Sequence, residues 1–220
     1  MLNGKENSYY LNSGEKTKIG QNVKKLSEQV NGEHTSDIIN SIMYVMIKNV
    51  DFDINSENNC CDSKKFKRTA EEIIADGYRN GCCDSSTLFV TLCRAKGIPA
   101  AQIITANIKA IETKHNYGVG HFYSAYYNKE RNDWVVIDSH KSQNDIDENG
   151  ICHGLNKREL LLNMQFIKDT DFIFACVRDY SEFSIKDLKI DSIESMNKIH
   201  RCVYQYYLEK NINKNENLEK

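Results

Sequence analysis

The chain has 220 residues, of which 40% are hydrophobic and 27% are charged, and its formal net charge is −2. This length and composition are those of a globular protein with a full core, and the near balance of charge argues against a nucleic-acid-binding surface. The longest apolar stretch, residues 38–50, is interrupted by polar side chains and is too short to span a bilayer. The first residues lack the pattern of a signal peptide, so we expect a cytoplasmic protein with neither nucleic acid nor membrane as a partner.

The eight cysteines are expected to be reduced thiols. Four of them form two adjacent pairs, Cys60-Cys61 and Cys82-Cys83, and neighbouring cysteines bond each other only with strain. Zinc sites use spaced pairs such as Cys-x-x-Cys, and the chain has none. We therefore predict no disulfide framework, no metal and no cofactor.

The predicted elements form a single domain over residues 1–220, with an ordered core at about 15–210, because both polar ends are expected to fray and no linker divides the chain. The first third of the chain predicts three helices, at residues 23–30, 36–50 and 69–76, with a polar loop at 51–65. A fourth helix is expected from about Asp84 to Lys96, since Gly97 suits a left-handed C-cap and Pro99 prevents continuation.

The middle of the chain favours strands. Three are expected at residues 100–108, 119–127 and 133–138, with a polar turn between the last two. A surface loop, a helix, a strand and a final helix then follow, at residues 142–150, 157–166, 171–177 and 193–208. Helices first and neighbouring strands afterwards predict an α+β fold, in which N-terminal helices pack on an antiparallel β-sheet.

The residues with chemical potential are a cysteine, a histidine and an aspartate in consecutive elements. Cys82 stands at the mouth of the fourth predicted helix, where backbone N–H groups and the helix dipole stabilise a thiolate. If the following hairpin turns between Lys129 and Glu130, His121 lies directly opposite Asp138, with Cβ atoms about 4.5–5.5 Å apart. The turn has no glycine to fix a two-residue hairpin, so a bulge would change this register.

A thiol, a base and an orienting carboxylate are the groups of covalent catalysis. In this hypothesis Cys82 attacks an acyl carbon as a thiolate, His121 holds and returns the proton, and Asp138 orients the imidazole. The N–H of Cys82 is one natural oxyanion donor, and the sequence does not place a second. Taken singly, the three residues have structural interpretations: a small buried hydrophobe, a strand histidine and a turn former. The functional interpretation prevails because all three occur in order, each in its expected element.

Three sequence blocks resemble a known family. They are the run from Gly81 to Ala100, Gly120-His121-Phe122-Tyr123, and Trp134-Val135-Val136-Ile137-Asp138. In this order they resemble the core of the transglutaminase-like superfamily, over roughly Thr69 to Ser139. The resemblance implies a papain-like fold with the nucleophile at a helix N-terminus and a Cys-His-Asp triad.

The resemblance also indicates which of two adjacent cysteines reacts. The family's nucleophile stands two positions before an acidic residue and about fifteen before the glycine of Gly-Ile-Pro. Cys82 satisfies both conditions through Asp84 and Gly97, and Cys83 satisfies neither. Neighbouring helical positions point about 100° apart, so only one of the two thiols can face His121.

The leading hypothesis is an enzyme that forms a thioester through Cys82 and cleaves or exchanges an amide bond in a protein or peptide substrate. Water as acceptor makes it a peptidase or deamidase, and an amine makes it a transglutaminase. The size of the chain and the bacterial character of its core sequence favour hydrolysis. The alternatives are an inert binding scaffold on the same fold and a thiol redox protein using Cys82-Cys83. Near the site, we expect Trp134 to pack or to form a wall, and His140 to be solvated. The oligomeric state is not predicted.

Overall fold

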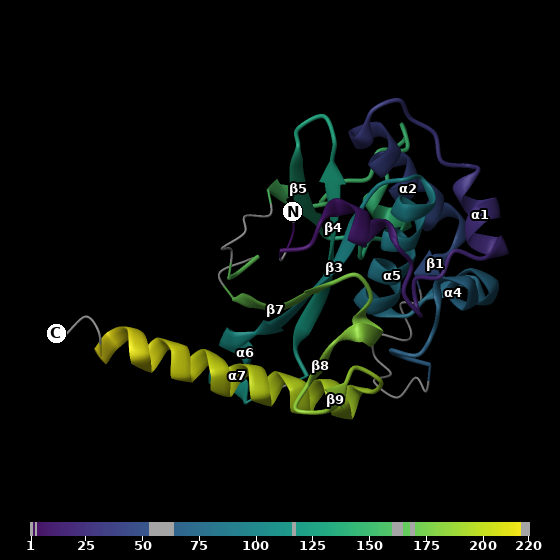
Figure 1. The fold of residues 1–220 in the computed structure, drawn as a ribbon. Coiled ribbons are helices and arrows are strands. Elements are labelled where there is room, and N and C mark those ends of the chain that lie inside the picture. The colour runs from purple at the N-terminus through teal and green to yellow at the C-terminus, as the bar shows by residue number, and fades with distance from the viewer. Residues whose placement is uncertain are drawn as a thin grey trace.

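The centre of the molecule is a five-stranded antiparallel sheet (Figure 1). The computed structural model describes residues 2, 4–52, 64–115, 118–159, 165–167 and 170–216. The strand order is β6-β5-β4-β3-β7. The bounds are Ala100–Asn107 for β3, Gly120–Asn128 for β4, Asp133–Ile137 for β5, Arg158–Glu159 for β6 and Asp171–Val177 for β7. The four longer strands correspond to the four that the sequence predicts.

Four helices gather beside the sheet: α1 (Gln21–Ser27), α2 (Thr35–Asn49), α4 (Ala70–Asp76) and α5 (Gly81–Ala95) (Figure 1). The helix α5 is buried along almost its whole length between α2 and the strands β3 and β4. One continuous core joins Met43 of α2, Leu88 of α5 and Tyr126 of β4. The predicted α+β fold, with N-terminal helices packed on an antiparallel sheet, is confirmed.

Local signals explain where α4 begins and ends. The hydroxyl of Thr69 accepts a hydrogen bond from the N–H of Glu72, and the Glu72 carboxylate accepts one from the N–H of Thr69 at 2.7 Å. This reciprocal capping box satisfies two backbone donors that the first turn would otherwise leave open. Gly77, at φ +74°, ends the helix in a left-handed conformation that favours glycine.

Several short elements differ from the prediction. The expected polar loop at 51–65 begins as a strand, β1 (Asp51–Phe52), which pairs in parallel with β2 (Tyr78–Arg79), and residues 53–63 lie outside the described part. The expected helix at 157–166 is wrong at its start, where β6 pairs with β5; residues 160–164 are not described. The structure adds the helix α6 (Ile108–Lys114), the hairpin β8 (Ser184–Ile185) with β9 (Leu188–Lys189), and the 3-10 turns η1 (Asn7–Leu11), η2 (Gln143–Asp145) and η3 (Tyr180–Glu182).

The last helix, α7 (Ile193–Glu216), is longer than the predicted 193–208 and projects beyond the rest of the molecule (Figure 1). Its first half packs Met196, Ile199 and Val203 into a second core, together with Phe122 of β4 and Phe172 of β7. In the part of the chain that the structure describes, no helix has both the length and the apolar character needed to cross a membrane.

The N-terminal strap, defined here as residues 4–20, lies against the folded core. We expected residues 1–14 to fray, but Tyr10 within η1 is only 1% exposed. The reason is a buried cation: Arg94, near the end of α5, donates from Nε to the carbonyl of Tyr10 at 2.8 Å and from Nη1 to the hydroxyl of Thr17 at 2.7 Å. The polar N-terminal strap is therefore ordered by its hydrogen bonds to the core beneath it.

Candidate active site

Cys82 lies in the first turn of α5, which begins at Gly81, three residues before the expected start at about Asp84. Asp84 sets this start, because its carboxylate accepts a hydrogen bond from the N–H of Asn80 at 2.8 Å. The same carboxylate forms a buried ion pair with Arg68. The positive charge of Arg68 balances the negative charge of Asp84, so the region beside the thiol carries no unpaired buried carboxylate.

The thiol of Cys82 is in contact with groups that favour its ionised form. Burial by itself would raise the pKa of this thiol, but the charge of His121, a hydrogen bond with its ring and another from the N–H of Phe122 together hold the pKa below its ordinary value. Cys83 differs, since burial and the nearby Asp84 raise the pKa of its thiol well above the usual range. Of the two adjacent thiols, Cys82 is the one with a reactive environment.

His121 joins the thiol to a carboxylate. Its Nε2 lies 2.9 Å from Oδ1 of Asp138, which leaves Nδ1 for Cys82. Burial would lower the pKa of His121, but the Cys82 thiolate and the bond to Asp138 raise it strongly. Burial likewise would raise the pKa of Asp138, and the imidazole overrides this and holds it below its usual value. The three groups form one continuous polar contact.

The ring of His121 also rests on an anchored aromatic side chain. The rings of His121 and Tyr123 meet edge to face, with centroids 4.5 Å apart. The hydroxyl of Tyr123 donates to Oδ2 of Asp171 at 2.6 Å, and the amide of Asn107 donates to the other carboxylate oxygen. Packing and hydrogen bonding therefore restrict the orientation of the imidazole.

The predicted register of the hairpin is wrong by two residues. Strand β4 pairs with β5 so that Asn128 faces Asp133 and Ser124 faces Ile137, and the turn is centred one residue later than expected. Asp138 follows the end of β5 and is not directly opposite His121. Because a shift of two residues keeps every side chain on its own face, the carboxylate still reaches the imidazole diagonally.

A cavity of about 80 Å³ opens beside Cys82 and His121. Lys65 and Phe66 line one part of it, and Met196 and His200 of α7 line another. A side chain at Gly120 would bring Cβ within 2.2 Å of the carbonyl oxygen of Thr105 and 2.7 Å of the His200 ring, so this wall requires a glycine. The sequence does not predict the α7 wall, because nothing in it indicates where a distant helix will pack.

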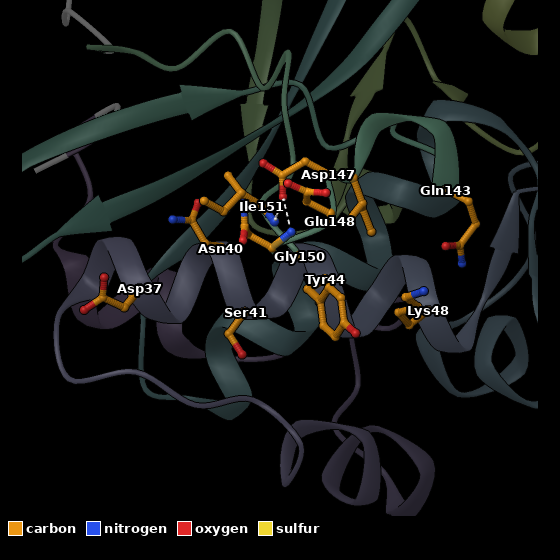
Figure 2. A pocket seen from close by; sticks show the side chains of 12 residues that line it. Asp37, Asn40, Ser41, Tyr44, Lys48, Gln143, Asp147, Glu148, Gly150 and Ile151 are labelled. Atoms are coloured by element: carbon orange, nitrogen blue, oxygen red, sulfur yellow. Dashed lines mark hydrogen bonds between the residues drawn. The ribbon is translucent and has the colours of Figure 1, made fainter.

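A much larger cavity, of about 680 Å³, lies between α2 and the loop at 143–151 (Figure 2). It shares no lining residue with the cavity at Cys82. Two of its polar side chains have local partners: Asp147 accepts from the N–H groups of Asn149 and Ile151, both at 2.9 Å, and Ser41 accepts from the N–H of Asn31. This hollow contains neither thiol nor imidazole, so we do not assign it to the chemistry.

Two residues that the sequence places near the site, Trp134 and His140, lie in different surroundings. Trp134 packs against Tyr10 and donates to the side chain of Asn7 at 3.2 Å, so it belongs to the contact with the N-terminal strap. His140, expected to be solvated, is instead half-buried. Its backbone N–H donates to Oδ1 of Asp138 at 3.1 Å, and its Nδ1 lies 3.3 Å from the hydroxyl of Ser85.

The described residues contain no group of three His, Cys, Asp or Glu side chains arranged to hold a metal ion. The cysteine pair at residues 60–61 lies outside the described part of the chain.

The model of a family described as the transglutaminase-like superfamily matches residues 24–139, which is more than half of the chain. The chain therefore belongs to the transglutaminase-like superfamily. It is 32% identical over 119 residues to an uncharacterized protein of Haemophilus influenzae, and this alignment covers 53% of the chain but only 31% of that relative. The matched range contains Cys82, His121 and Asp138, whereas the helix α7 lies beyond it.

Two solved structures are similar to this chain. One is a suspected cysteine protease from Cytophaga hutchinsonii, with a TM-score of 0.46 and 16% identity over 85% of this chain and 62% of that one. The other is a TGase, with a TM-score of 0.41 and 17% identity over 58% of this chain and 32% of that one. In both cases the chain spans less than two thirds of the other protein.

Proposed function

We propose that this protein is a cysteine-nucleophile enzyme that acts on amide bonds of protein or peptide substrates, with Cys82, His121 and Asp138 as its triad. The observation that carries the proposal is the unbroken contact from the Cys82 thiol through the His121 ring to Asp138, with 2.9 Å between imidazole and carboxylate. Membership of the transglutaminase-like superfamily supports a cysteine-based reaction of this kind.

The reaction begins with the thiolate of Cys82 and the protonated imidazole of His121. The sulfur attacks the amide carbon, the C–N bond breaks, and His121 gives its proton to the departing amine, which leaves a thioester. Water then attacks the thioester, His121 accepts the proton of that water, and the acid is released as the thiolate re-forms. Asp138 keeps the ring oriented and charged while the proton is held.

The oxyanion formed during attack needs N–H donors. The backbone N–H of Cys82, in the first turn of α5, is one donor at the helix N-terminus. With water as the acceptor the product is a cleaved or deamidated substrate, and with an amine it is a cross-linked one. We favour hydrolysis and treat amine transfer as the alternative to be tested.

The test uses a library of proteome-derived peptides, incubated with the full chain and a labelled primary amine. Mass spectrometry then reads new peptide termini, deamidated glutamines and amine adducts, which distinguish peptidase, deamidase and transglutaminase activity. We expect one of these products with the wild type and with Cys83→Ser, and none with Cys82→Ala. Equal product profiles for wild type and Cys82→Ala would leave an inert scaffold, and loss of activity in Cys83→Ser would favour a reaction of the cysteine pair.

A further inference from the structure

Three buried hydroxyl groups link the three elements that carry the candidate triad. Ser86 lies one turn after Cys82 in α5, Ser124 lies three residues after His121 in β4, and Ser139 directly follows Asp138. All three side chains are fully buried, at 0% exposure. The Oγ atoms of Ser124 and Ser86 are 3.1 Å apart, and those of Ser124 and Ser139 are 2.7 Å apart.

The direction of every proton in this hydroxyl chain follows from its end. Ser86 donates to the backbone carbonyl of Tyr123 at 3.1 Å, so its single proton is used there. The bond between Ser124 and Ser86 must then use the proton of Ser124, and the bond between Ser139 and Ser124 must use the proton of Ser139. Each hydroxyl therefore donates to the next in one direction, from Ser139 after β5, through Ser124 in β4, to Ser86 in α5.

A second polar bridge holds the same segment from its other side. Arg79, itself 0% exposed, donates from Nη1 to the hydroxyl of Ser85 at 3.2 Å and from Nη2 to the carbonyl of Lys141 at 2.8 Å. Ser85 can then donate to Nδ1 of His140, whose backbone N–H donates to Asp138. Residues 138–141 are thus tied to α5 through both Ser139 and His140.

A hydroxyl at each of these positions is not needed for burial alone. A buried hydrogen bond adds little net stability over a well-packed apolar group of the same size, so three alanines would fill most of the space. Hydrogen bonds differ from apolar contacts in fixing direction and separation. A chain of three, with one member on each triad-bearing element, fixes those elements relative to one another.

We propose that Ser86, Ser124 and Ser139 are positioning residues, which hold the Cys82 sulfur, the His121 ring and the Asp138 carboxylate at the separations that the thiolate–imidazolium pair requires. This inference rests on the proposed function, since it concerns the same triad. Ser124 is the decisive member, because it is the only one of the three bonded to both others.

The experiment compares Ser124→Ala with a matched control, Thr91→Val. Thr91 also has a fully buried hydroxyl, but this hydroxyl donates to the Thr87 carbonyl at 2.7 Å, so its hydrogen bond stays within α5. Iodoacetamide labelling of Cys82 is followed by mass spectrometry as a function of pH, and urea unfolding is recorded for each variant. We expect Ser124→Ala to move the labelling midpoint up by about one pH unit, a tenfold slower reaction on the acid limb. Thr91→Val should lower the unfolding midpoint without moving the labelling curve.

An unchanged labelling midpoint in folded Ser124→Ala overturns the inference, and so does an equal shift in Thr91→Val. If Ser124→Ala does not fold, Ser139→Ala takes its place, because it removes only the first hydroxyl of the series. An unchanged labelling midpoint in Ser139→Ala, or an equal shift in Thr91→Val, then overturns the inference. The outcome is separable from that of the proposed function. If the protein has no amide-bond activity but its labelling curve depends on Ser124, the proposed function is rejected and the positioning role of the serines stands. If the protein is active but its labelling curve does not change in Ser124→Ala, the proposed function stands and the positioning role is rejected.

Discussion

At the scale of single residues, His121 holds the site together because it contacts an acid on each side. The protonated ring stabilises the ionised forms of the Cys82 thiol and the Asp138 carboxylate, and these two negative charges stabilise the protonated ring. The pKa of the thiol therefore falls while the pKa of the imidazole rises. Between these two values the charged pair is the dominant form.

This pair predicts two different pH profiles. Alkylation of Cys82 needs only the thiolate, so its rate should rise once with pH, around a midpoint below the ordinary thiol pKa of about 8.5, and then stay level. Turnover also needs the proton on His121, so it should rise with the same midpoint and fall again as pH passes the raised imidazole pKa. Stopped-flow labelling and initial-rate measurements check this. Labelling with the midpoint of a free thiol would contradict it.

Asp138→Asn tests the carboxylate with little change of shape. Without the negative charge, the imidazolium loses a partner, the pKa of His121 falls and less of Cys82 is ionised at neutral pH. We expect kcat/KM to fall by a factor on the order of 10⁴, as loss of an orienting carboxylate does in related triads. The labelling midpoint of Cys82 should rise in parallel. Asp147→Asn, at a half-buried carboxylate that lines the larger cavity and shares none with the site, should leave both quantities unchanged.

At the scale of elements, the start of α5 places the thiol. Gly81 has a φ of +78°, and a Cβ added there would meet no heavy atom within 4 Å, so an alanine is disfavoured by conformation alone. Gly97, two residues beyond the end of α5, has the same properties at φ +74°. The two glycines provide a matched pair at opposite ends of one helix.

Gly81→Ala and Gly97→Ala should lower the free energy of unfolding by similar amounts, about 1–2 kcal/mol each, which urea titration measures. Only Gly81→Ala should also slow the alkylation of Cys82, because relief of the strain there changes the first turn of the helix. Equal labelling rates in the two variants would show that this turn does not control the position of the sulfur.

The sequence predicted the elements whose signals are local. Helix α4 has its capping box and its terminal glycine within ten residues, and strand β7 was predicted with the bounds that it has. The order of Cys82, His121 and Asp138 was also visible. Such features depend on periodicity and capping, which neighbouring residues specify.

Other features depend on tertiary contacts and could not be predicted. The hairpin register follows from a four-residue turn, in which Asn132 adopts φ +56° and Asn128 accepts from the N–H of Arg131, and no glycine indicated it. The short strand β6 exists only because β5 lies beside it. Met196 and His200 are far along the chain from Cys82, and only the packing of α7 brings them to its cavity.

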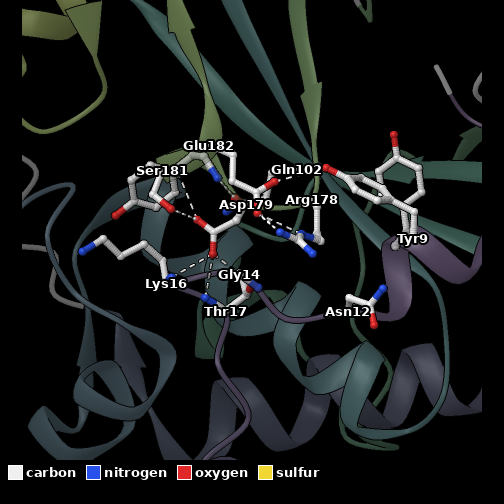
Figure 3. A network of polar contacts seen from close by, with 12 residues as sticks. Tyr9, Asn12, Gly14, Lys16, Thr17, Gln102, Arg178, Asp179, Ser181 and Glu182 are labelled. Atoms are coloured by element: carbon white, nitrogen blue, oxygen red, sulfur yellow. Dashed lines mark hydrogen bonds and ion pairs between the residues drawn. The ribbon is translucent and has the colours of Figure 1, made fainter. Parts of the chain in front are cut away.

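At the scale of the whole molecule, the buried carboxylate of Asp179 connects the N-terminal strap to the segment that follows β7 (Figure 3). Asp179 accepts from the N–H groups of Lys16 and Thr17 at 2.8 and 2.9 Å, and from the N–H and hydroxyl of Ser181. A Cβ at Gly14 would lie 2.4 Å from the Cβ of Asp179, so the strap approaches too closely for a larger residue. The contact links segments more than 160 residues apart.

Asp179→Ala should therefore destabilise the protein strongly. The change leaves several buried donors without an acceptor, and hydrogen bonds to a charged group are worth about 1.5–3 kcal/mol each, so a loss of roughly 3 kcal/mol or more is expected. Asp147→Ala is the control, because that carboxylate also accepts from two backbone N–H groups, but these hydrogen bonds are exposed to solvent. Urea unfolding of both variants measures the difference. Similar losses would show that the strap adds little to global stability.

Arg94 has a consequence for how the chain is made. Its guanidinium binds the carbonyls of Tyr10, Ala100 and Arg178, which leave the ribosome in that order and many residues apart. A nascent chain that lacks Arg178 holds this cation with its set of acceptors incomplete. Strand β7 and Arg178 have to emerge before the N-terminal strap can be held in place, so we expect the strap to gain its full protection only after Arg178 has been translated.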